Sequence, residues 1–129
     1  MAYIIQKNDS NITTVIYSGG VDLNERTKAV EEVCESINPD EPIRLLIDVR
    51  NITMNMSEDE QEYFGKYLAA KDKLSKAKVA VLHNPQNNPN MVINTFAYIE
   101  GYQVVGFDKP NDATAWLLPS RPQRIPRRF

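Results

Sequence analysis

The feature that most constrains the fold is a nearly continuous apolar run, IRLLIDV, from Ile43 to Val49. A strand with one face in water alternates apolar and polar residues, whereas a run of this kind is typical of a strand that is covered on both faces. Covering both faces requires helices packed against each side of the sheet. We therefore expect this segment at the centre of the sheet of an α/β domain.

Short β-like runs and longer helical runs alternate along the rest of the chain. Residues 3–7 and 12–18 are rich in β-branched and aromatic side chains, and the residues between them, Asn8 to Asn11, favour a turn. These two runs predict an antiparallel hairpin, which Gly19-Gly20 ends. The further strands are expected at residues 78–82 and 103–107.

Four helices are expected between and after these strands. At the first two helix starts a glutamate follows the N-cap residue by three positions, which is the spacing of a capping box. At the third, a proline occupies the first helical position, where its missing N–H does little harm. The residues at the four starts are Asp22, Ser57, Asn88 with Pro89, and Asn111-Asp112.

The predicted order of elements is ββαβαβαβα, which is typical of the α/β class. We expect a mixed, mostly parallel sheet of about five strands and about four helices, connected by right-handed crossovers. One domain at residues 1–118 would hold them all, and the basic, proline-rich tail at 119–129 is expected to be disordered. Open α/β sheets bind ligands at the carboxyl ends of their parallel strands, so the loops at that edge are candidates for a site.

The composition predicts a soluble, cytoplasmic protein without a membrane span. No apolar run approaches the roughly 20 residues of a membrane helix, and the N-terminus lacks the pattern of a secretory signal. The single cysteine, Cys34, falls on the apolar face of the first helix and is expected in the core. Four arginines lie in the last nine residues, so the rest of the chain is more acidic than the net charge of −2 suggests. An acidic body argues against nucleic-acid binding.

The sequence lacks the motifs of catalysis and cofactor binding. His83 is the only histidine and has no second ligand residue nearby for a metal. No serine or cysteine stands in a recognisable pattern with a base and an orienting acid. Gly19-Gly20 lacks the glycine spacing that cradles a phosphate. We therefore predict that the protein is not an enzyme and uses neither a metal nor a cofactor.

Three segments carry a resemblance to a known family. They are IRLLIDVRNIT from Ile43, KVAVL from Lys78 and GYQVVGFDKPNDATAWL from Gly101. Across residues 2–118 the pattern resembles the STAS domain, the fold of anti-sigma factor antagonists, and more closely its SpoIIAA-like branch of small stand-alone proteins. The resemblance implies a regulatory module that binds a protein partner, or an apolar ligand as in the lipid-binding Sec14 fold, rather than a catalyst.

Ser57 is the position that this resemblance relates to phosphorylation. In anti-sigma factor antagonists a serine at the start of the corresponding helix is phosphorylated, and a gapless count from Asp48 places Ser57 there. The neighbouring residues differ, because Met56 replaces an aspartate and Glu58-Asp59 replaces a Ser-Gly pair. Helix capping alone explains a serine here, so phosphorylation of Ser57 is the minor alternative.

The segment from Asp48 to Ser57 is expected to be a loop that presents a binding surface. Its two methionines have no place in a periodic pattern and are expected to be exposed, while the tyrosines of the following helix belong to its buried stripe. The predicted surface consists of Met54, Met56, Ser57, Tyr63 and Tyr67. It would engage a protein partner or a second copy of the chain. The alternative is an apolar small molecule or lipid held in a pocket between the second and third helices.

Overall fold

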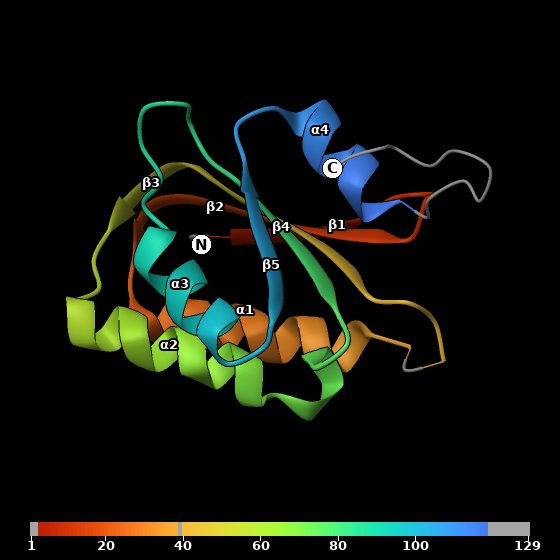
Figure 1. Ribbon diagram of the computed structural model, residues 1–129, viewed down its shortest axis with the longest axis horizontal. Helices are drawn as coiled ribbons and strands as arrows, with labels where there is room; N and C mark the ends of the chain where they lie inside the picture. Colours follow the sequence, from red (N-terminus) through yellow and green to blue (C-terminus); the bar gives the residue numbers. More distant parts are fainter. Residues whose placement is uncertain (1–2, 39, 119–129) are drawn as a thin grey trace.

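The computed structural model of the protein describes residues 3–38 and 40–118, in which five strands form a single sheet (Figure 1). Strand β1 is antiparallel to β2, and the remaining neighbours are parallel, in the order β1-β2-β3-β4-β5. The predicted apolar run lies in β3, the central strand. The strands are β1 Tyr3–Lys7, β2 Ile12–Val21, β3 Arg44–Met54, β4 Lys78–Leu82 and β5 Gln103–Phe107.

Four α-helices and one short 3-10 helix cover the sheet. They are α1 Leu23–Ser36, α2 Glu58–Ala70, the 3-10 helix η1 Asp72–Leu74, α3 Met91–Ile99 and α4 Pro110–Leu117. Figure 1 shows α1 and α2 below the sheet and α4 above it. The α/β class, the mixed sheet and the order ββαβαβαβα are thus confirmed. None of the described helices combines the length and the apolar character needed to cross a membrane.

The two faces of the sheet bury cores of unequal size. Neighbouring residues of β3 point to opposite faces, as the period of a strand requires. Leu45 belongs to the large core, which includes α1, α2 and α3, whereas Leu46 packs in the small core under α4. Cys34 lies in the large core, as predicted. The apolar run at β3 therefore reflects a strand with helices on both sides.

The first two helix starts are capping boxes, as predicted. The Asp22 carboxylate accepts a hydrogen bond from the Glu25 backbone N–H at 2.9 Å, and the Ser57 hydroxyl accepts one from the Glu60 N–H at 3.1 Å. In return, the Glu60 carboxylate accepts from the Ser57 N–H at 3.0 Å. Both helices thereby satisfy N–H groups that would otherwise have no partner.

The predicted starts of the third and fourth helices are wrong. Helix α3 follows Asn90 rather than Asn88, because the Asn88 side chain accepts a hydrogen bond from the Asn90 N–H and holds this segment in a turn. Helix α4 has Pro110 at its first position and Lys109 at its N-cap, so it begins earlier than Asn111. In both cases the proline or asparagine signal lies within two residues of the true start.

Strands β2 and β3 are longer than predicted. A bulge between Ile16 and Ser18 shifts the register, after which the pairing continues through Gly19 and Ile52 to Val21 and Met54. Gly19 therefore lies inside β2 instead of ending it. The segment predicted as a loop from Asp48 to Ser57 is mostly strand, and only residues 55–57 connect β3 to α2. The predicted disordered tail at 119–129 falls outside the described residues.

Candidate functional site

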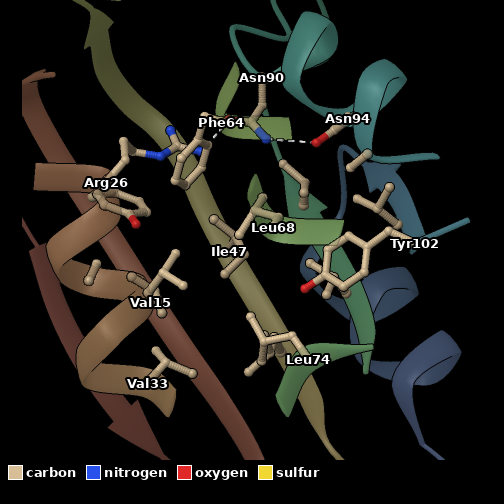
Figure 2. A pocket seen from close by; sticks show the side chains of 18 residues that line it. Val15, Arg26, Val33, Ile47, Phe64, Leu68, Leu74, Asn90, Asn94 and Tyr102 are labelled. Atoms are coloured by element: carbon tan, nitrogen blue, oxygen red, sulfur yellow. Dashed lines mark hydrogen bonds between the residues drawn. The ribbon is translucent and has the colours of Figure 1, made fainter. Parts of the chain in front are cut away.

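A cavity of about 40 Å³ lies between the sheet and helices α1, α2 and α3. Strands β2 to β5 supply its floor, and its walls are mostly aliphatic side chains from these strands and helices. Polar groups enter at one end: Figure 2 shows Arg26, Asn90 and Asn94 in its upper part. Leu74 and Val33 lie at the opposite, apolar end in the same view. The cavity therefore has a polar end and an aliphatic end.

Arg26 is the charged group of this site and is only 2% exposed. Its Nη2 donates a hydrogen bond to Asn90 Oδ1 at 2.6 Å. The guanidinium lies over two rings, with its carbon 4.6 Å from the centre of Tyr17 and 5.1 Å from that of Phe64. Within residues 3–38 and 40–118, Arg26 Nε and Nη1 have no hydrogen-bond partner.

A buried guanidinium of this kind is costly for the fold. Burying a charge without a counter-ion costs several kcal/mol, of which a desolvated cation–π contact offsets about 2 kcal/mol. No salt bridge involves Arg26 among the residues described. Burial raises the pKa of the Tyr17 phenol, while Arg26 opposes this effect, so Tyr17 is neutral at neutral pH and provides no negative charge. Such an uncompensated group is typical of a functional site.

Asn90 fixes the direction of the hydrogen bonds around Arg26. Its Nδ2 donates to Asn94 Oδ1 at 2.7 Å, which leaves Oδ1 to accept from Arg26. Asn90 is 2% exposed and precedes α3, so its backbone position is set by the start of that helix. Arg26 of α1, Asn90 before α3 and Asn94 of α3 consequently form one hydrogen-bonded polar end of the cavity.

Burial lowers the pKa of the Arg26 guanidinium, and the nearby Tyr17 phenol acts in the opposite direction. Arginine nevertheless starts from such a high pKa that it keeps its proton at neutral pH. At the other end of the cavity, burial raises the pKa of the Tyr102 phenol, and Cys34 adds to this effect. The cavity therefore contains one positive charge and neutral phenols at neutral pH.

Arg26 is not among the site residues predicted from the sequence, although the sequence contains a signal for it. The apolar residues of the first helix recur at helical spacing, and Arg26 falls on the same face, in phase with Leu23 and Val30. A charged residue inside an apolar stripe indicates either a long side chain that reaches the surface or a buried functional group. The structure places Arg26 in the core and so supports the second interpretation.

The predicted surface of methionines and tyrosines is only partly assembled. Met56 is 6% exposed and belongs to the large core, and Met54 lies in β3 and packs against the same core. The expectation that both are exposed is therefore wrong, because Met56 is buried in the large core and Met54 is only partly exposed. Gln61 Nε2 of α2 also donates to the Met56 carbonyl at 3.0 Å. Ser57 is exposed and caps α2.

The two predicted tyrosines lie together on α2. Tyr63 is 56% exposed, so its expected place in the buried stripe is wrong. Its ring stacks on Tyr67, with 6.2 Å between the ring centres. The Tyr67 hydroxyl donates to the Glu31 carboxylate, which also pairs with Lys71. This part of α2 is thus tied to α1 by side chains at the surface.

The middle of the central strand β3 carries an internal ion pair. Arg50 Nη2 contacts Asp48 Oδ2 at 2.8 Å, and the Arg50 N–H donates to Asp48 Oδ1 at 3.0 Å. Burial raises the pKa of the Asp48 carboxyl, but the hydrogen bonds and charge of Arg50 outweigh this and hold the pKa below its ordinary value. The nearby His83 ring is hydrogen-bonded to the Asn84 carbonyl at 2.8 Å. In the part of the chain that the structure describes, no three His, Cys, Asp or Glu residues are grouped to hold a metal.

Comparison with known proteins supports the fold. No protein-family model matches the sequence, and no curated protein is significantly similar to it. Among solved structures, the chain is similar to an uncharacterised protein of the DUF3478 family from Shewanella loihica PV-4, which has a SpoIIAA-like fold. The two are 18% identical, with a TM-score of 0.58 over 90% of this chain and 92% of the other. The fold is therefore SpoIIAA-like, as the resemblance in sequence predicted.

Proposed function

We propose that this SpoIIAA-like domain is a non-catalytic, cytoplasmic binding module that takes an apolar small molecule or lipid chain into its cavity. The observation that carries the proposal is the aliphatic cavity between the sheet and α1, α2 and α3. Natural cores are packed to high density and contain few voids larger than a water molecule. A void lined by residues of four strands, three α-helices and the 3-10 helix η1 is a suitable place for an alkyl chain.

The size of the cavity indicates how a ligand enters. An engineered cavity of roughly 150 Å³ holds benzene, whereas the cavity in this structure measures about 40 Å³. The ligand therefore has to widen the cavity by moving side chains or by separating a helix from the sheet. Leu68 on α2 and Ile47 on β3 both line it, so a shift of α2 away from the sheet would open the space (Figure 2).

The test is a titration of methyl-labelled protein with 1-hexanol, followed by NMR. Methyl groups that line the cavity, such as those of Val33, Leu68 and Leu74, are expected to shift. The methyl groups of Leu46 and Leu117 lie on the opposite face of the sheet and are the internal control. Equal shifts on both faces, or none at the cavity, would argue against the proposal.

A second candidate function is regulation through a protein partner or a second copy bound at the start of α2. The observation that favours it is Tyr63, a large side chain that is 56% exposed and lies beside Tyr67, on the helix that the exposed Ser57 caps. The variant Tyr63→Asp keeps the core intact, whereas changes at Met56 would disrupt it. Sedimentation equilibrium of wild type and Tyr63→Asp tests the self-association form: a dimer that the variant loses supports it, and a monomeric wild type contradicts it.

A further inference from the structure

We infer that Arg26 anchors the carboxylate of the ligand, so the cavity takes an amphipathic monocarboxylate with an alkyl chain rather than a neutral apolar molecule. This inference rests on the proposed function, because it names the chemical class of the ligand for the same cavity. It depends on a separate observation, the hydrogen-bonding state of a buried guanidinium.

Arg26 has hydrogen-bond donors that no described residue uses. A guanidinium carries five N–H groups in one plane and accepts no hydrogen bond. Asn90 occupies one donor of Nη2, while Nε and Nη1 are unpartnered within the described residues and are buried. A carboxylate matches the spacing of neighbouring guanidinium donors and forms short, charge-assisted hydrogen bonds with them. The site therefore already contains the positively charged partner of a strong ion pair, and the carboxylate of a ligand would be the negative one.

The charge of the cavity lining suits a ligand with a single negative charge. Arg26 is the charged residue of the cavity lining, and the remaining polar residues that line it are neutral side chains of asparagine and tyrosine. One carboxylate would neutralise the site. A dianionic phosphate would leave a net negative charge in an aliphatic environment, which is strongly unfavourable. The balance thus favours a monoanion.

The positive charge lies at one end of the aliphatic wall of the cavity. Arg26 and Asn90 lie at one end of the cavity, Ile47 and Leu68 lie along its middle, and Leu74 lies toward the other end (Figure 2). A ligand with its carboxylate at Arg26 would direct its chain between the sheet and α2 toward Leu74. The positive charge would meet the carboxylate of a fatty acid, and the aliphatic wall would meet its alkyl chain.

The experiment compares hexanoate with 1-hexanol, two ligands with chains of equal length and different head groups. Binding is measured by NMR titration of wild type, Arg26→Met and the control Lys28→Met. Lys28 is an exposed residue of the same helix, so its variant removes one positive charge without touching the cavity. Wild type and Lys28→Met should bind hexanoate at least about tenfold more tightly than hexanol, since hydrogen bonds to charged groups contribute enough for such a ratio. Arg26→Met should lose this preference and keep its affinity for hexanol.

A direct readout on wild type makes the test independent of whether Arg26→Met folds. The ¹⁵Nε–¹H resonance of Arg26 should shift when hexanoate saturates the protein and should move much less with hexanol. An unmoved resonance, equal affinities for the two ligands, or undiminished hexanoate binding by a folded Arg26→Met would each overturn the inference. In those cases hexanol binding would still support the cavity proposal, and Arg26 would then be satisfied by water. If neither ligand binds wild type, the proposed function itself fails.

Discussion

Gly65 controls how closely α2 and α3 approach, and the variant Gly65→Ala tests that packing. A Cβ atom at this position would lie 2.7 Å from the Ile93 carbonyl oxygen and 3.0 Å from Phe96 Cβ. The oxygen belongs to the backbone of α3 and cannot rotate away, so the two helices must separate by several tenths of an ångström. At an exposed position inside a helix, replacing glycine by alanine would stabilise the protein by about 1 kcal/mol.

The expected magnitude follows from these opposing effects. Overpacking of a core costs about 1–3 kcal/mol, and three close contacts at Gly65 put the cost in the upper part of that range. After the gain in helix propensity, we expect a net loss of about 1–2 kcal/mol in the free energy of unfolding. For a domain of this length this corresponds to a fall in Tm of roughly 4–8 °C.

Urea denaturation followed by circular dichroism measures this loss, and Gly20→Ala is the matched control. A Cβ atom at Gly20 would lie 2.5 Å from Asn55 Nδ2, which is the end of an exposed, flexible side chain. That side chain can rotate away, so Gly20→Ala should change stability by less than about 0.5 kcal/mol. A Gly65→Ala protein as stable as wild type would refute the packing argument and would mean that α2 and α3 separate freely.

Two further predictions concern the cap of α2 and the N-terminal strand. Ser57→Ala should lower the free energy of unfolding by about 1 kcal/mol, because the Glu60 N–H loses its acceptor, whereas Ser57→Asp should retain most of the stability. A loss in Ser57→Asp equal to that in Ser57→Ala would contradict the capping role. A hydrogen bond to Glu32, together with burial, raises the pKa of Tyr3 to about 12. This contribution to stability is complete below pH 10 and is lost as the pH rises toward 12, so Tyr3→Phe should show a shallower fall in stability over that range; an unchanged slope would refute it.

Local sequence patterns predicted most of the fold. The errors arise where contacts between residues distant in sequence determine the secondary structure. The apolar run at 43–49 and the two capping boxes depend on neighbours in sequence, and the structure has them as expected. Beyond Asp48 the pairing of β3 with β2 resumes at Asn51 and Ser18, after one extra residue in β3, and the polar sequence between Arg50 and Thr53 does not reveal this pairing. Tertiary pairing thus turned a predicted loop into a strand.

The candidate site was harder to predict from the sequence than the fold was. The phase of Arg26 on the apolar stripe of α1 is visible in the sequence, but its lack of a counter-ion depends on which side chains of α2, β2 and α3 surround it. Met56 shows the opposite case. It lies outside any periodic pattern because it precedes α2, yet it is buried in the large core.

The position of α4 has a consequence for local unfolding. Its core contains four fully buried residues, Ile12, Ala80, Ala113 and Leu117, and Lys78 reinforces it by donating to the Trp116 carbonyl at 2.6 Å. So small a cluster stabilises weakly, and we expect the amide hydrogens of α4 to exchange with solvent before those of α1 and α2. Detachment of α4 would uncover the far face of β3, β4 and β5 while the wall of the cavity stays closed.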